Sequence, residues 1–164
     1  MMITLKNFDP SIIPQLTPIM KRAFDEDTRL HLKEPSGGPE GYEDGSFLKK
    51  WFLHPGASAY SVYDGATLIG GVNLWIREDR HNILGCIFLD PDHENRGYGT
   101  KVWALIEKRY PDTLVWKTET PIFSRRNHAF YINKCGFKCV RIINPRDERN
   151  GFFMLEKDMR KTSL

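Results

Sequence analysis

The alternation of apolar and polar residues divides the start of the chain into a short strand and a helix. Residues 2–8 alternate, with Ile3 and Leu5 apolar, which predicts a strand. The apolar residues that follow recur at helical spacing, so we expect a helix that starts at one of two residue-proline pairs, 9–10 or 17–18. The apolar stripe of this helix consists of Leu16, Ile19, Met20, Ala23 and Phe24.

A loop and a second helix complete this part of the chain. Residues 34–45 are rich in glycine, proline and acidic residues, and they predict a surface loop. From Ser46 the apolar residues fall at i, i+1, i+4 and i+5, which indicates a short helix that ends before residues 54–56, His-Pro-Gly.

The middle of the chain has the period of strands. Three segments rich in Val, Ile and aromatic residues, at 59–63, 67–76 and 82–89, predict a meander. Residues 64–65, Asp-Gly, favour a tight hairpin between the first two of these strands.

The last third of the chain mixes helices and strands. Apolar residues at helical spacing from about Tyr98 predict a helix that Pro111 ends. The expected elements after it are a strand at 114–118, a helix at 127–135 and strands at 138–144 and 151–157. This order of elements predicts a fold of the α/β (α+β) class in one domain over residues 1–164.

Composition adds little beyond the class of an ordinary globular domain. Of the 164 residues, 40% are hydrophobic and 27% are charged, which is enough for one sizeable core. The start of the chain lacks the features of a secretory signal, and no apolar run approaches the roughly 20 residues that span a bilayer. We therefore expect a cytoplasmic protein without a membrane partner, either a monomer or a homodimer.

Cysteines and histidines give no sign of a metal site. The three cysteines, Cys86, Cys135 and Cys139, form no C-x-x-C pair, which argues against a disulfide framework and a zinc site. We expect them to be buried free thiols. The five histidines lack the spacing that would place two on one helix face, so no metal is expected.

Charge is distributed unevenly, although the net value of +3 is too small to argue for nucleic-acid binding. Residues 25–44 contain seven acidic and two basic residues, whereas residues 96–141 contain ten basic and three acidic residues. The acidic segment could attract a cationic molecule, or it could simply be a solvated loop.

An apolar strand that ends at Leu89 leads into a glycine-bearing loop that opens a helix. The first N–H groups of a helix have no internal partners and its dipole adds partial positive charge, so a pyrophosphate fits there. Gly97 and Gly99 would let the backbone approach the phosphates, although tight packing of strand on helix is the structural alternative. A Rossmann fingerprint needs glycine where Val102 stands and a P-loop needs lysine where Thr100 stands, so both are excluded.

A second informative segment, residues 127–137, predicts a short helix closed by Gly136. A glycine there suits the left-handed C′ position, and Phe137 could then pack back on Ile132. A purely structural helix end remains open as an interpretation of this segment taken alone.

Together the two segments resemble the GNAT superfamily of N-acetyltransferases. That family carries a loop of the form Gln/Arg-x-x-Gly-x-Gly/Ala and then a helix with Asn, Ala and Tyr that closes in Gly-Phe. The corresponding residues are Glu94, Asn95, Arg96, Gly97, Tyr98 and Gly99, then Asn127, Ala129, Tyr131, Gly136 and Phe137. Glu94 departs from the family, and a carboxylate beside phosphates is unfavourable unless it points away, so Arg96 could supply the positive charge.

The resemblance covers nearly the whole chain and implies the GNAT fold, a central mixed, largely antiparallel seven-stranded sheet flanked by about four helices. It also implies acetyl-CoA as co-substrate, an amine as acceptor, and a bulged strand that splays from its neighbour before the glycine loop. The coenzyme phosphates then account for the basic segment, so no nucleic-acid partner is expected. The residues implied to bind the coenzyme are Phe88, Leu89, Glu94, Asn95, Arg96, Gly97, Tyr98, Gly99, Thr100, Asn127, Tyr131 and Lys134.

Acetyl transfer to an amine requires removal of the amine proton and protonation of the departing thiolate. Tyr131 matches the family's tyrosine that points at the coenzyme sulfur, and a phenol with an ordinary pKa of about 10 can donate a proton. Glu119 and Asp90 are candidates for the base, and either could instead be a solvated or turn residue. The alternative function is that of an acyl-CoA-binding protein of the same fold without catalysis, acting as a sensor or assembly subunit.

Overall fold

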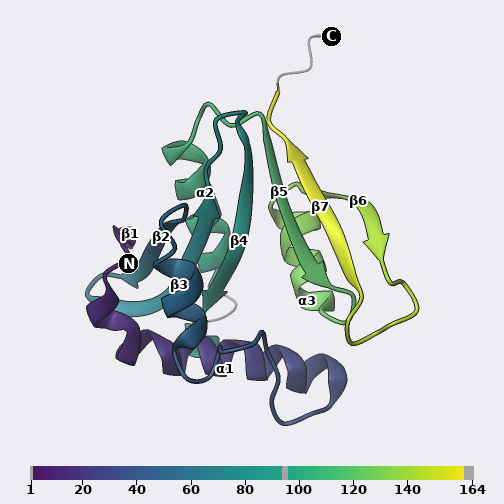
Figure 1. Ribbon diagram of the computed structural model, residues 1–164, viewed down its shortest axis with the longest axis horizontal. Coiled ribbons are helices and arrows are strands. Elements are labelled where there is room, and N and C mark those ends of the chain that lie inside the picture. Colours follow the sequence, from purple (N-terminus) through teal and green to yellow (C-terminus); the bar gives the residue numbers. More distant parts are fainter. Residues whose placement is uncertain (1, 94–95, 161–164) are drawn as a thin grey trace.

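The computed structural model describes residues 2–93 and 96–160 and contains one seven-stranded sheet (Figure 1). The strand order is β1-β2-β3-β4-β5-β7-β6, in which β4 and β5 are parallel and every other neighbouring pair is antiparallel. The predicted mixed, largely antiparallel sheet is therefore confirmed. The strands are β1 (Ile3–Asn7), β2 (Ser58–Asp64), β3 (Thr67–Trp75), β4 (His81–Leu89), β5 (Val115–Pro121), β6 (Lys138–Ile143) and β7 (Phe152–Asp158).

Helices cover the two faces of this sheet unequally. The α-helix α1 (Ile13–Leu32) and the π-helical turn η2 (Leu48–Phe52) lie on one face, and α2 (Tyr98–Arg109) and α3 (Arg125–His128) lie on the other (Figure 1). α3 continues as a π-helical segment η4 (Ala129–Lys134). Short 3-10 turns, η1 (Pro10–Ile12) and η3 (Pro91–His93), precede α1 and follow β4.

Two apolar clusters, one on each face, hold the layers together. On the first face, Leu16 and Met20 of α1 are fully buried with Phe52 and Phe88 in the same cluster. The larger cluster packs Trp103 of α2 against other buried side chains, including Trp116 of β5 at a ring separation of 5.1 Å. Adjacent side chains of β3 point to opposite faces of the sheet and therefore face opposite clusters, because side chains alternate along a strand.

Neither predicted start of the first helix is its boundary, because the pair 9–10 lies before the helix and the pair 17–18 lies inside it. The Asp9 side chain accepts a hydrogen bond from the Ser11 N–H and thereby caps the turn η1, after which α1 begins at Ile13. Pro18 lies inside α1, which continues to Leu32. The acidic residues 25–27 are consequently helical, and the irregular segment predicted at 34–45 begins only after the helix.

The sheet divides between β4 and β5. Their parallel ladder runs over three pairs, from His81–Val115 to Ile83–Lys117, and the strands then diverge (Figure 1). The register between β3 and β4 shifts beside Asn73, which marks a bulge around Gly85. A bulged strand that splays from its neighbour was expected from the sequence resemblance, and the structure has this geometry. We call the resulting opening the split.

The predicted helix end at Gly136 is confirmed, whereas the predicted burial of the cysteines is confirmed only in part. Gly136 has a φ of 86°, and the Phe137 N–H donates to the Tyr131 carbonyl at 2.9 Å, so the predicted left-handed helix end is present. Of the three free cysteines, Cys135 is buried and Cys86 is half-buried, but Cys139 is exposed. The expectation of buried thiols is wrong for Cys139 because it lies on the edge strand β6, where no further strand of the described chain covers it.

Candidate active site

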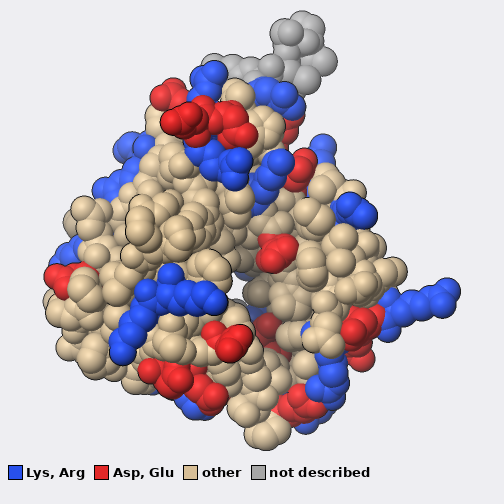
Figure 2. Space-filling view, viewed as in Figure 1, with Lys and Arg blue, Asp and Glu red and all other residues tan. Residues whose placement is uncertain are grey.

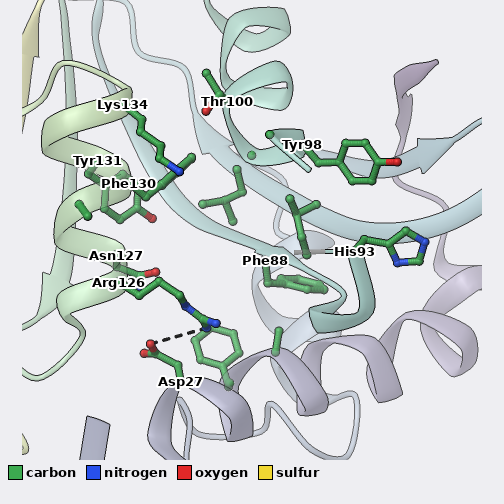
Figure 3. Close-up of a pocket in the computed structure, with 17 residues that line it drawn as sticks. Asp27, Phe88, His93, Tyr98, Thr100, Arg126, Asn127, Phe130, Tyr131 and Lys134 are labelled. Carbon is green, nitrogen blue, oxygen red and sulfur yellow. Dashed lines mark ion pairs between the residues drawn. The ribbon is translucent and has the colours of Figure 1, made fainter. Parts of the chain in front are cut away.

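A cavity of about 300 Å³ lies at the split, bounded by α1, the end of β4, the start of α2 and the α3–η4 segment. Figure 3 shows Thr100 and Lys134 at one end of this cavity and Asp27 and Arg126 at the other. Eight of the residues implied to bind a coenzyme are brought together with Tyr131 in its lining. They are Phe88, Leu89, Gly97, Tyr98, Gly99, Thr100, Asn127 and Lys134.

The start of α2 forms the end of the cavity at which the sequence predicts an anion, and we call it the anion-binding end. Gly97 precedes this helix with a φ of 72°, a left-handed conformation that favours glycine. A Cβ on Gly99 would lie 2.8 Å from the ring of Phe130, so a larger residue there would push that ring into the cavity. The first N–H groups of this 12-residue helix lie here and have no partners within the helix, so this end of the cavity suits a phosphate group.

The charged side chains near this end differ from the sequence expectation. Lys134 points from η4 toward Thr100 and lines the cavity (Figure 3). Arg96 is exposed and is not among the described residues that line the cavity. The implied contacts of Glu94 and Asn95 lie outside the described residues. Lys134 is therefore the cation that the structure places at the anion-binding end.

Tyr98 contributes in a different way from its neighbours in the loop. Its side chain turns away from the cavity (Figure 3), is buried, and donates a hydrogen bond to Asp64 Oδ2 at 2.7 Å. This bond ties the start of α2 to the end of β2. The tyrosine thus fixes the position of the helix whose N–H groups face the cavity.

Tyr131 lies within the split, on the α2 side of the sheet. Its side chain is buried, with the ring 5.1 Å from Phe130 and 5.8 Å from Phe137. Burial, reinforced by nearby Cys86, raises the pKa of Tyr131 far above its ordinary value, and a hydrogen bond with Thr118 acts in the opposite direction. The phenol therefore stays protonated at neutral pH and is able to donate a proton.

Glu119 lies on the opposite face of β5 from Tyr131. Thr118 faces the split from the α2 side, where its hydroxyl donates to the Leu84 carbonyl at 2.8 Å, so the next residue points to the α1 side. Glu119 is exposed, and among residues 2–93 and 96–160 none forms an ion pair with it. It does not line the cavity of Figure 3 but stands beside the split on the open face.

The second candidate for a base, Asp90, is already engaged. Arg22 Nη2 donates to Asp90 Oδ2 at 2.6 Å, and the N–H of Asp92 donates to the other carboxylate oxygen at 3.1 Å. Asp90 is buried and does not line the cavity. It holds the end of β4 against α1, which leaves Glu119 as the candidate with a free approach from solvent.

Two charged residues of the cavity form a contact that the sequence analysis did not predict. Asp27 of α1 is buried and accepts a hydrogen bond from Ser124 at 2.9 Å, while Arg126 Nη2 lies 3.8 Å from the same oxygen, Oδ1 (Figure 3). They are far apart in sequence and meet because α1 crosses the open end of the split. No local signal could have paired them.

The acidic run at 25–44 is largely neutralised by neighbouring cations. Asp25 pairs with Lys21, Glu26 with Arg29, and Glu34 with Arg149. Together with Asp27, four of the seven acidic residues therefore have a cationic partner. The segment presents less uncompensated negative charge than its composition suggests.

The sheet thus opens between β4 and β5, with the start of α2 at the mouth of the split and the buried Tyr131 inside it. The family model described as the acetyltransferase (GNAT) family matches residues 20–137, and the chain therefore belongs to this family. The family assignment and the fold predicted from the sequence are confirmed. The family is one of acetyltransferases.

One sequence relative and two solved structures illustrate what the chain is similar to. The chain is 39% identical over 110 residues to YrkN, an uncharacterized protein of Bacillus subtilis (strain 168), in an alignment that spans 63% of this chain and 60% of that protein. An acetyltransferase from Thermus thermophilus superposes with a TM-score of 0.76 at 14% identity, covering 96% of this chain and 97% of that one. The PaiA N-acetyltransferase of Thermoplasma acidophilum, solved with coenzyme A, superposes with a TM-score of 0.75 at 16% identity, covering 96% and 99%.

The described part of the chain offers neither a metal site nor a membrane-spanning helix. Residues 2–93 and 96–160 contain no group of three or more His, Cys, Asp or Glu side chains arranged to hold a metal ion. Within the same residues, no helix has both the length and the apolar character needed to cross a membrane.

Proposed function

We propose that this protein transfers the acetyl group of acetyl-CoA to a primary amine by direct attack. The observation that carries the proposal is the placement of Tyr131 and Glu119 on opposite faces of the sheet where β4 and β5 diverge. A proton donor on one side and a proton acceptor on the other suit a reaction in which an amine enters from one face and a thiolate leaves toward the other.

Acetyl-CoA would be held by backbone groups more than by side chains. The N–H groups at the start of α2, together with Lys134, suit the pyrophosphate, and the backbone of Phe88 and Leu89 suits the amide groups of the pantetheine arm. Asn127 lies on the opposite wall and offers an amide to the same arm. Coenzyme A in the related PaiA N-acetyltransferase structure supports this assignment of the cavity.

The chemistry that the proposal assigns to side chains is a pair of proton transfers. Glu119 accepts a proton from the incoming ammonium, and the free amine nitrogen forms a bond to the thioester carbonyl carbon. The carbon–sulfur bond then breaks, the nitrogen releases its second proton to solvent, and the Tyr131 hydroxyl gives its proton to the departing thiolate. Tyr131 regains a proton from solvent and Glu119 loses one to solvent, so the products are an amide and coenzyme A.

Two measurements separate this proposal from a coenzyme-binding protein without catalysis. Calorimetry with acetyl-CoA tests the site, and release of free coenzyme A across a panel of primary amines tests the chemistry. Binding with turnover on at least one amine supports the enzyme. Binding without turnover on any amine supports the sensor or assembly subunit, and absence of binding refutes both.

The role of Glu119 has its own test. Glu119→Gln removes the proton acceptor without changing the size of the side chain, so kcat should fall about 10²-fold at neutral pH, and the loss should shrink as pH approaches the pKa of the free amine. Glu78→Gln is the matched control, because Glu78 is an exposed carboxylate in the β3–β4 turn. Equal rates for Glu119→Gln and the wild type would remove Glu119 from the mechanism.

A further inference from the structure

An aromatic cluster lies exposed on the α1 side of the sheet, outside the cavity of Figure 3. The rings of Trp51 and His54 are 6.4 Å apart, His54 and Trp75 are 4.9 Å apart, and Trp51 and Trp75 are 6.4 Å apart. Trp51 is 36% exposed, and His54 is also exposed. We call these three residues the aromatic cluster. Trp75 is half-buried beneath them. An exposed apolar patch with aromatic side chains is typical of a surface that meets a ligand or partner.

The aromatic cluster borders the split. A Cβ on Gly85 would lie 2.8 Å from Trp75 Nε1, so the indole lies over this glycine. Ile83–Lys117 is the last pair of the β4–β5 ladder, and two residues farther along each strand stand Gly85 and Glu119. The Trp75 indole and the Glu119 carboxylate therefore stand on the two sides of the split where it begins.

The surface between them is open. Figure 2 shows the molecule from the same side as Figure 1, and this face is hollowed between the two halves of the sheet. Beyond Glu119 the floor continues to Met154 of β7, its directly paired neighbour, whose side chain is 38% exposed. The hollow thus combines the Glu119 carboxylate with an aromatic wall and an apolar floor.

From this arrangement we propose that the acceptor is a primary amine of single positive charge on an aromatic body, with its ammonium at Glu119 and its ring on the aromatic cluster. The inference rests on the proposed function and specifies the substrate class. Indole faces attract both ammonium groups and aromatic rings. The Lys50 ammonium group already makes such a contact, with its Nζ 4.9 Å from the Trp51 ring centroid.

The charges around the hollow argue against a polyamine. Arg141 is the cross-strand partner of Met154, so a cation stands two strands from Glu119 on the same face. Lys117 precedes Glu119 by two residues and shares that face, although its Nζ lies 3.9 Å from Glu156. A second ammonium on the acceptor would meet these cations, whereas an uncharged ring would not.

An acceptor panel tests the substrate class. Phenethylamine carries one ammonium and one ring, n-butylamine has the ammonium without the ring, and spermidine has several charges without a ring. We expect phenethylamine to have a kcat/KM about tenfold or more above each of the other two. A preference for spermidine, or equal values for phenethylamine and n-butylamine, would overturn the proposal.

Substitution of the cluster tests the site. Trp75→Leu and, separately, Trp51→Leu should raise the KM for phenethylamine about tenfold and leave the KM for acetyl-CoA and for n-butylamine unchanged. Tyr63→Leu is the matched control, since Tyr63 carries a lysine over its ring at 4.3 Å but lies on β2, away from the split. Thermal unfolding of each variant confirms that it folds, and unchanged KM values in both folded tryptophan variants would refute the assignment.

A direct binding experiment distinguishes failure of this inference from failure of the proposed function. Phenethylamine is titrated into wild type, Trp75→Leu and Tyr63→Leu while tryptophan fluorescence is recorded. If no amine is acetylated but phenethylamine binds to the wild type and Tyr63→Leu and not to Trp75→Leu, the proposed reaction fails and the amine site stands. If amines are acetylated but phenethylamine binds to Trp75→Leu as tightly as to the wild type, the reaction stands and this site fails.

Discussion

The hydroxyl of Ser124 donates a hydrogen bond to Asp27 Oδ1, and this bond joins α1 to the residue that precedes α3 across the open end of the split. Both residues are buried, with Ser124 completely inaccessible to solvent. Because the bond is shielded from water and connects the two sides of the split, it should contribute to stability as well as to the shape of the cavity.

Asp27→Ala should therefore destabilise the protein by about 1–3 kcal/mol, because the Ser124 hydroxyl would be left buried without an acceptor. Asp27→Asn keeps an oxygen in place and should cost less. Urea unfolding measures both values. Glu26→Ala is the control on the same helix, where a solvent-screened surface pair with Arg29 should add little to stability. Similar losses for Asp27→Ala and Glu26→Ala would show that the buried bond adds nothing.

Gly99→Val should weaken acetyl-CoA binding by about tenfold or more. A Cβ at this position would already lie 2.8 Å from Phe130, so the valine would force that ring into the space beside the start of α2. Calorimetry gives the affinity. Ala104→Val introduces the same side chain at an exposed position of the same helix and should leave the affinity unchanged. Unaltered affinity in a folded Gly99→Val protein would contradict the placement of the phosphates.

Tyr131→Phe should lower kcat by roughly 10²-fold while acetyl-CoA affinity and stability remain close to wild type. The ring contacts with Phe130 and Phe137 survive, and only the hydroxyl is lost. Tyr42→Phe deletes another buried phenol hydroxyl, one that bonds to Asp25 outside the cavity, and it should leave kcat unchanged. Full activity of Tyr131→Phe at every pH would reduce Tyr131 to a packing residue.

The pH dependence of kcat offers a second test of Tyr131. Burial raises the pKa of this phenol, so its protonated, proton-donating form persists to higher pH than for a free tyrosine. The wild type should consequently show no loss of kcat from pH 7 to about 10, the ordinary pKa of a tyrosine. A decline near pH 10 that disappears in Tyr131→Phe would mean that burial does not raise the pKa of the hydroxyl in solution.

The three thiols should differ sharply in reactivity. Burial raises the pKa of Cys86 to about 12 and that of Cys135 to about 11, so both remain protonated thiols at neutral pH, whereas Cys139 is exposed. A thiol-labelling reagent at pH 8 should modify one cysteine quickly, and Cys139→Ser should abolish that fast phase. Fast labelling of Cys86 instead would mean that the split opens more than the structure indicates.

Much of this arrangement follows from local sequence patterns. The strands, the glycine loop and the Gly136 helix end depend on residues close together in the chain, and each was predicted near its observed position. The start of α1 was less certain because two residue-proline pairs satisfy the same rule, and Pro18 is accommodated inside the helix. Local rules place such elements well and their boundaries poorly.

The composition of the site was predictable only in part. Asp27 and Arg126 enter the cavity because α1 crosses the split, and no pattern around either residue indicates this contact. The aromatic cluster was likewise hidden, since Trp51 belonged to an apolar stripe that resembles a core helix face. Whether a tryptophan is covered depends on how far η2 extends over the sheet, which is a property of the tertiary structure.

The three-pair ladder between β4 and β5 has a consequence for the lifetime of the protein as well as for its chemistry. A molecule that fills the split supplies contacts that the two strands do not make with each other, and it does so in the folded state alone. Ligand at 100 times its dissociation constant would then add about 2.7 kcal/mol to folding stability. The concentration of acetyl-CoA would in this way affect the fraction of protein molecules that unfold and are degraded by proteases.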